Sequence, residues 1–362
     1  SGLVSKSKSG EGPPRIISID ENQAFKGGRP TLKSIAEICG LAVPTVSRAL
    51  SGASDIGQST RDRVRQVADE IGYVPNRAGV RLRTGKTNVI SLVLPTEIDG
   101  LNYSSRIIAS IAGALRNSPY HLIVTPFFPD EDPIKPVRYI VETESADAII
   151  INQIQPEDAR VKYLLERNFP FATHGRSMWA EQHPYFDFDN FEFARNATEL
   201  LAARGRKSLL LISPPLTQNY AQNMIAGMQS TAKETGLYCD FFEEPAQRGT
   251  SNKLHHKMME YLTNHPETDG IITSTTVSAV GAINAIGALG RHSGKDIDLC
   301  TKEVAPFFRQ IRPEILTITE DVTQAGSFLA QAALQAIDHP EDPPLQMLVT
   351  PENTTAMTTA IT

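Results

Sequence analysis

Cysteines and long apolar runs are scarce in this sequence of 362 residues, and each scarcity excludes a class of protein. The three cysteines, Cys39, Cys239 and Cys300, lie far apart, which argues against a disulfide framework and against a zinc site. No apolar run approaches the roughly 20 residues that a membrane-spanning helix needs. The opening residues also lack the apolar stretch of a secretory signal. We therefore expect a cytoplasmic protein without a bound metal.

Motifs of nucleotide and hydrolytic chemistry are also missing. The sequence has no GxxxxGK[ST] phosphate loop and no GxGxxG after its first apolar strand, so neither nucleotide hydrolysis nor dinucleotide binding is indicated. No pairing of a nucleophile with a base supports an enzyme. His255 and His256 have no acid or cysteine at ligand spacing, and we interpret them as surface side chains. We expect no cofactor and no catalytic residue.

What the chain does have is an uneven distribution of charge. Its formal net charge is −6. Residues 29–86, however, hold ten basic and five acidic side chains, a net charge of +5, so the rest of the chain carries −11. A basic module on an acidic body is typical of a protein that brings one part to a polyanion and keeps the other part away from it.

Three short helices are predicted within this basic segment. The apolar spacing places the first helix in 31–40 and the second in 43–50, and the third begins at a Ser59 cap. Pro44 is compatible with the second helix, because a proline in the first helical turn removes an N–H group that would lack a partner anyway. Two helices joined by a short turn, the second of them basic, predict a helix-turn-helix.

From residue 88 onward, short apolar strands alternate with amphipathic helices. This alternation predicts parallel sheets with helices on both faces, and a length of about 265 residues favours two α/β lobes over one. The predicted strands are 88–95, 121–127, 146–152, 169–175, 207–213, 269–274 and 296–301.

Several motifs together carry a family resemblance. The head contains TVSRAL (45–50), GYVPN (72–76) and LRTGKTN (82–88), and the body contains FPFATHGR, DFDN and ILTITED. In these features the chain resembles the lactose-repressor (LacI/GalR) family of bacterial transcriptional regulators. The resemblance implies a homodimer that represses transcription by binding double-stranded operator DNA, in the bacterial cytoplasm and at the nucleoid when bound. It also implies allosteric control by a small effector, a sugar or sugar derivative.

The resemblance also implies the domain organisation. An all-α helix-turn-helix head would be joined to a two-lobed body like that of periplasmic binding proteins. The expected segments are a flexible extension (1–28), the head (29–75), a hinge helix and linker (76–87), and the effector-binding and dimerisation body (88–362). Within the body, the N-terminal lobe is expected at about 88–187 and 320–340, and the C-terminal lobe at about 188–318 and 344–360.

In such proteins the second helix of the head lies in the major groove. Arg48 matches a position that contacts a guanine edge, whereas Val43 and Pro44 can offer only apolar contact. Leu82 matches the leucine that hinge helices wedge into the minor groove. Gly79 replaces the usual alanine, and because a mid-helix glycine costs roughly 0.5–1 kcal/mol, this hinge should be more reluctant to fold without DNA. The expected DNA contacts are Thr31, Val43, Pro44, Thr45, Ser47, Arg48, Thr60, Asn76, Arg77 and Leu82.

The effector is expected in the cleft between the lobes, at the carboxyl ends of the strands. Met224 stands where the family usually has an arginine, and Glu303 is the carboxylate left in CTKEV, so the identity of the effector stays open. Aromatic faces combined with planar polar groups suit a sugar. The expected effector contacts are Thr96, Tyr103, Phe127, Asn152, Arg176, Asp189, Tyr220, Thr275 and Glu303.

One alternative function remains on the sequence alone. A solute-binding protein of the periplasmic type, without a role in transcription, would have the same two-lobed body. The basic head argues against it, because a basic helix-turn-helix is the pattern of a DNA-binding module.

Overall fold

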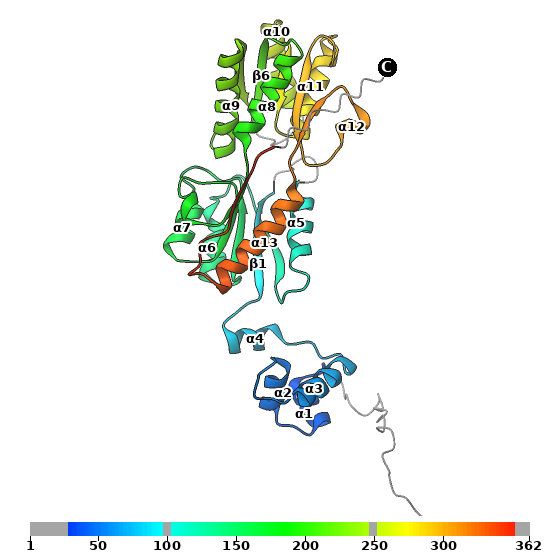
Figure 1. Cartoon of the computed structure of the whole chain (residues 1–362), viewed down its shortest axis with the longest axis vertical. Coiled ribbons are helices and arrows are strands. Elements are labelled where there is room, and N and C mark those ends of the chain that lie inside the picture. Colours follow the sequence, from blue (N-terminus) through cyan, green and yellow to red (C-terminus); the bar gives the residue numbers. More distant parts are fainter. Residues whose placement is uncertain (1–27, 97–102, 246–251, 352–362) are drawn as a thin grey trace, which may run out of the picture. The chain divides into compact units, whose positions relative to one another are not determined.

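The computed structural model describes residues 28–96, 103–245 and 252–351 (Figure 1). The chain divides into two units, one that ends at Lys86 and one that begins at Thr87. The expected extension, apart from residue 28, lies outside the described residues. Within the described ranges, no helix is long and apolar enough to cross a membrane.

The three predicted helices of the head are present. They are α1 (Leu32–Cys39), α2 (Val43–Leu50) and α3 (Gln58–Glu70), and they bury a shared cluster that includes Ile35, Val46 and Val64. Gly40 ends α1 in the left-handed region, with φ of 65°, where glycine avoids the strain that a side chain would add.

The start of α3 differs from the prediction. The helix begins at Gln58, with Gly57 at its cap position and no capping side chain, so Ser59 lies inside the helix and does not cap it. The Nη1 group of Arg61, in α3, donates to the carbonyl of Gly52 at 3.2 Å, which ties α3 to the preceding loop.

The hinge segment forms a fourth helix, α4 (Arg77–Thr84), capped by the side chain of Asn76. None of its residues is buried, and Gly79 lies near its middle. A helix of eight residues without a buried face is marginal in water, because it has no packing to stabilise it. Packing within the described residues therefore contributes little to the stability of this helix.

The first lobe is a parallel sheet with helices on both faces. The strand order is β11-β5-β4-β3-β1-β2. Helices α5 and α13 pack on one face, where Ile107, Ile111 and Leu329 are buried, and α6 and α7 pack on the other. The elements are β1 (Val89–Pro95), α5 (Tyr103–Ala114), β2 (His121–Phe127), α6 (Ile134–Glu142), β3 (Ala148–Asn152), α7 (Ala159–Glu166), β4 (Phe171–His174), β5 (Tyr185–Phe188), α13 (Val322–Asp338) and β11 (Gln346–Val349).

The second lobe repeats this plan with the strand order β10-β9-β8-β6-β7. Helices α8 and α9 cover one face and α10 and α11 the other. A Cβ atom at Gly227 of α9 would lie 2.2 Å from the carbonyl oxygen of Phe191, so only glycine permits this approach of α8. The elements are α8 (Asn190–Ala203), β6 (Ser208–Ser213), α9 (Asn219–Thr235), β7 (Tyr238–Glu243), α10 (Asn252–Asn264), β8 (Gly270–Thr273), α11 (Thr276–Ala288), β9 (Asp298–Glu303), α12 (Phe308–Ile311) and β10 (Leu316–Thr319).

The expected place of the last segment needs correction. Residues 344–360 were expected in the C-terminal lobe, but β11 pairs in parallel with β5 and therefore belongs to the first lobe. The physical reason is that α13 returns along the first sheet, which brings the following residues to the free edge of β5. Residues 352–360 lie outside the described residues.

Candidate functional site

The recognition helix α2 presents a mixed surface. Val46 and Ala49 are buried against α1 and α3, whereas Val43, Pro44 and Arg48 are exposed. The guanidinium Nη2 atom of Arg48 lies 2.5 Å from the Oδ2 atom of Asp55, in the loop after the helix. The apolar start and the cationic end of α2 are thus both accessible.

The other predicted DNA contacts lie on the surface of the same unit, and several of their polar groups are engaged within the chain. Thr31 caps α1 and Asn76 caps α4. The Ser47 hydroxyl accepts a hydrogen bond from Arg83. Leu82 is 89% exposed. Arg77 is exposed, whereas Thr45 and Thr60 are half-buried.

A cleft lies where the carboxyl ends of the two sheets face each other. It contains a cavity of about 190 Å³. The first lobe contributes β3, β4, β5 and the start of α5, and the second contributes the starts of α8, α9 and α11 and the end of β9. The polar lining residues are Tyr103, Asn152, Gln153, His174, Arg176, Asp187, Asn190, Asn219, Tyr220, Ser274, Thr275, Thr276, Lys302, Glu303 and Glu320.

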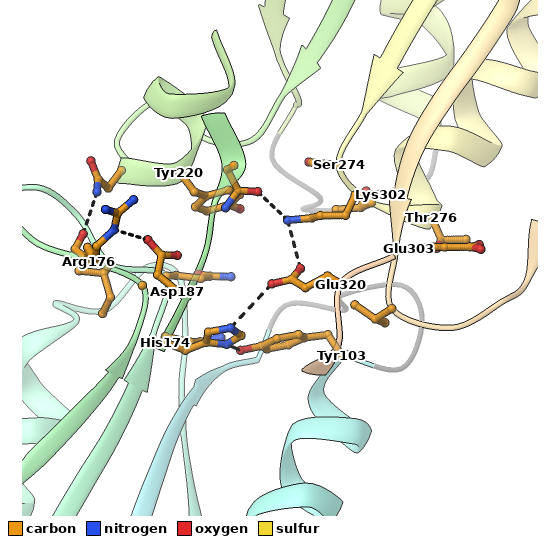
Figure 2. A pocket seen from close by; sticks show the side chains of 18 residues that line it. Tyr103, His174, Arg176, Asp187, Tyr220, Ser274, Thr276, Lys302, Glu303 and Glu320 are labelled. Carbon is orange, nitrogen blue, oxygen red and sulfur yellow. Dashed lines mark hydrogen bonds and ion pairs between the residues drawn. The ribbon is translucent and has the colours of Figure 1, made fainter. Parts of the chain in front are cut away.

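A chain of buried and half-buried polar groups joins the two lobes across this cleft (Figure 2). Lys302 of β9 is nearly buried, and its Nζ atom lies 3.1 Å from Glu320 Oε2 and 3.0 Å from Asn190 Oδ1. The other carboxylate oxygen of Glu320 lies 3.8 Å from His174 Nε2, and His174 Nδ1 lies 2.5 Å from the Tyr103 hydroxyl. Burial lowers the pKa of His174 more than Glu320 raises it, so this imidazole is neutral at pH 7.

A second ion pair lines the first lobe. Arg176 Nε donates to Asp187 Oδ2 at 2.7 Å. Burial raises the pKa of Asp187 to about 6, because desolvation outweighs the hydrogen bond and the charge of Arg176. Burial also raises the pKa of Glu303, whose carboxylate accepts the backbone N–H of Phe308 at 3.3 Å.

Two buried oxygen atoms of the lining have no hydrogen-bond partner among the described residues. They are Oδ1 of Asn152, at the end of β3, and Oγ of Ser274, just after β8. A buried polar atom without a partner is unfavourable by about 1–3 kcal/mol, so these two atoms mark positions where a bound molecule would gain hydrogen bonds.

Six of the nine predicted effector contacts line the cleft: Tyr103, Asn152, Arg176, Tyr220, Thr275 and Glu303. The other three lie elsewhere. Thr96 is exposed, Phe127 is buried in the core under α6, and Asp189 caps α8 by accepting the N–H of Glu192.

Sequence reasoning missed several polar residues of the cleft. His174 and Asp187 lie at the ends of β4 and β5, so the rule that found Asn152 could also have found them. Lys302 and Glu320 also lie at the ends of strands, at the end of β9 and directly after β10, but β10 was not among the predicted strands and the sequence does not show that the two side chains pair.

Two profiles of known families match this chain. Residues 31–76 match "Bacterial regulatory proteins, lacI family", and residues 142–336 match "Periplasmic binding protein domain". Among solved structures, the lac repressor dimer bound to operator and the anti-inducer ONPF has a TM-score of 0.76 at 21% identity, covering 90% of this chain and 97% of that one. The CelR–cellobiose complex has a TM-score of 0.65 at 20% identity, covering 89% and 98%.

Two relatives are similar over nearly the whole chain. The HTH-type transcriptional regulator AglR of Rhizobium meliloti (strain 1021) is 31% identical over 326 residues, which cover 88% of this chain and 90% of AglR. The HTH-type transcriptional regulator RafR of Escherichia coli is 31% identical over 329 residues, covering 89% and 96%. The chain therefore belongs to the lacI family of bacterial regulatory proteins and is a DNA-binding transcriptional regulator.

Proposed function

We propose that the cleft binds a neutral carbohydrate and that this ligand controls the affinity of the head for operator DNA. The observation that carries the proposal is the pairing of charges in the cleft. Both lining cations are neutralised, Arg176 by Asp187 and Lys302 by Glu320, whereas the oxygens of Asn152 and Ser274 have no described partner.

This pairing favours hydroxyl groups over an anionic group. A phosphate or carboxylate would need a cation that is not already neutralised, and it would face the carboxylates of Asp187, Glu303 and Glu320. Sugar hydroxyls, in contrast, both donate and accept hydrogen bonds, so they suit carboxylates and amides equally. The ring of Tyr220 adds an apolar surface to the lining.

The comparisons support the same assignment. The structure of CelR is a complex with cellobiose, and that of the lac repressor is a dimer bound to operator. By analogy, this protein acts as a homodimeric repressor in the cytoplasm. The edge strand β2 exposes the apolar side chains of Ile123 and Val124, and Phe128 just after it is exposed as well, so this edge of the sheet is suited to a second copy. Sedimentation at the mass of one chain would contradict the dimer.

The ligand class can be tested by calorimetric titration of the full chain. The panel pairs neutral monosaccharides and disaccharides, cellobiose included, with their phosphates and their uronic acids. Saturable binding is expected for a neutral sugar. Preference for the charged member of a pair, or no carbohydrate binding at all, would overturn the proposal. The sugar that binds should also change the affinity of the protein for an operator duplex. By linkage, the duplex should change the affinity for the sugar by the same factor.

Arg48→Ala is expected to relax sequence discrimination at one base pair of each operator half-site by about 1–3 kcal/mol. The reason is that Arg48 is the cationic, hydrogen-bonding side chain at the exposed end of α2, whereas Val43 and Pro44 can offer only apolar contact. Base preferences from a selection among random duplexes measure the effect. If the base preferences of the variant equal those of the unmodified chain, Arg48 does not read a base.

Binding of the neutral sugar is expected to weaken about tenfold from pH 7 to pH 5 if the ionised Asp187 accepts a sugar hydroxyl. The folded-state pKa of Asp187, about 6, lies above its ordinary value, so acid protonates the acceptor within this window. The raised pKa also affects folding: the protonated Asp187 stabilises the folded state below about pH 4, and this contribution is lost as pH rises through the folded-state pKa of about 6.

Titrations of the sugar at pH 5, 6, 7 and 8 test this dependence, with Asp187→Asn as the comparison. The variant should bind with an affinity that hardly changes across the range. If it keeps the tenfold change, another group is responsible.

A further inference from the structure

We propose that Asp55 is a specificity-determining residue that positions Arg48 for base readout and keeps it from pairing with phosphates. The inference rests on the proposed base-reading role of Arg48. Its starting point is the 2.5 Å contact between Arg48 Nη2 and Asp55 Oδ2. Both side chains are accessible, at 58% and 50% exposure, so the pair lies on the surface of the reading helix.

The loop that carries Asp55 is held in place from several sides. The hydroxyl of Ser51 and the N–H of Ala53 both donate to the carbonyl of Arg48, each at 3.0 Å. The Nη1 group of Arg61 donates to the carbonyl of Gly52 at 3.2 Å.

The residue after Asp55 fixes the loop from the inside. Ile56 packs against the core of the head, and its N–H donates to the carbonyl of Ala53 at 3.2 Å. The backbone on both sides of Asp55 is therefore held in place beside the end of α2, which keeps its carboxylate within reach of Arg48.

The Asp55 carboxylate limits the conformations and the hydrogen-bond partners of Arg48. One Nη group is occupied by Asp55, which restricts the rotamers of Arg48 and leaves other N–H groups of the guanidinium for a guanine edge. Preorganisation of this kind favours the one geometry that a bidentate base contact requires.

The same carboxylate disfavours the competing contact. A guanidinium already paired with an anion gains less from a DNA phosphate, and Asp55 itself repels the backbone. Because phosphate contacts supply most of the sequence-independent affinity, the pair lowers non-specific binding more than specific binding.

The test is a selection of base preferences from a pool of random duplexes, carried out with the full chain and with Arg48→Ala, Asp55→Asn and Asp62→Asn. Asp62 is an exposed acid of the same head that hydrogen-bonds Gln58, so its variant removes the same charge elsewhere. Asp55→Asn should weaken the preference at the base pair that Arg48→Ala affects, by about fivefold or more. Asp62→Asn should leave that preference unchanged.

A second measurement separates positioning from simple charge removal. The affinity for a scrambled duplex is measured across a salt series. In Asp55→Asn, the plot of log affinity against log salt concentration should become steeper by about 0.9 for each head, because Arg48 becomes free to neutralise a phosphate. In the background of Arg48→Ala, the Asp55 substitution should produce neither effect.

The outcomes are distinguishable. If Arg48→Ala leaves all base preferences intact, the proposed role of Arg48 fails. If Arg48→Ala changes them but Asp55→Asn does not, or if Asp62→Asn does so equally, the role of Asp55 alone is overturned.

Discussion

Replacing Lys302 by methionine is expected to lower the free energy of unfolding of the two-lobed unit by about 3–5 kcal/mol. Methionine keeps the apolar stem of the side chain but removes the ammonium group that lies 3.1 Å from Glu320. Glu320 is itself buried, so its carboxylate would be left without a cation in a low-dielectric site beside the neutral imidazole of His174. An uncompensated buried charge of this kind is more destabilising than the loss of an exposed ion pair.

Chemical denaturation of the full chain, followed by circular dichroism, measures this loss. The double variant Lys302→Met/Glu320→Gln removes both charges and should recover most of the stability. Lys295→Met, at an exposed lysine, is the matched control and should lie within about 0.5 kcal/mol of the unmodified chain. A double variant as unstable as the single one would mean that the ion pair is not the cause.

Arg160→Met is expected to lower the free energy of unfolding by a similar amount, about 3–5 kcal/mol, through the loss of a different set of contacts. Arg160 is buried and binds Asp158 through Nε and Nη2, at 3.0 and 2.9 Å. Its Nη2 group also donates to the carbonyls of Asn152 and Gln153, the residues where β3 enters the cleft. The substitution therefore leaves a buried carboxylate without its cation, although Asp158 still accepts the backbone N–H groups of Gln155 and residue 160. It also removes a hydrogen bond from each of the two carbonyls, and it should weaken sugar binding as well.

The pH dependence identifies the cause of this second loss. Burial raises the pKa of Asp158, but the hydrogen bonds and the charge of Arg160 lower it more, so it lies below its ordinary value. The ion pair therefore stabilises the fold above about pH 4, and this stability is lost as pH falls through the lower, folded-state pKa. The deficit of Arg160→Met should be largest at neutral pH and shrink in acid.

Lys162→Met, at an exposed lysine of the same helix, serves as the control for Arg160→Met. It removes a positive charge from α7 without removing a buried partner. A deficit that stays constant as pH falls from 7 through the folded-state pKa of Asp158 would show that the loss comes from packing and not from the ion pair.

The head was predictable because its fold depends on local signals. The periodic apolar residues, the Gly40 stop and Pro44 in the first turn define α1 and α2 without any distant contact. The strands that were missed are short, or lie at or beside a sheet edge, as β5, β7, β10 and β11 do. Such strands alternate polar and apolar residues weakly, and only their neighbours in the sheet determine where they pair.

The cleft was predictable only in part, because its charges are paired over long distances in the sequence. Asp187 and Asp189 are equally plausible from the sequence, and the choice depends on where β5 ends: Asp187 faces Arg176, while Asp189 begins the next helix. Lys302 can be buried only because Glu320 and Asn190 surround it. Neither contact can be predicted from the residues next to Lys302 in the sequence.

The position of β11 has a consequence for the order in which the protein folds during synthesis. The second lobe occupies one continuous stretch, from α8 to β10, whereas the sheet of the first lobe needs α13 and β11, which are translated after it. Until the ribosome has passed residue 349, one face of the first sheet lacks α13 and the edge of β5 lacks its neighbour. The lobe whose translation begins first is thus completed last, after the whole of the second lobe has been translated.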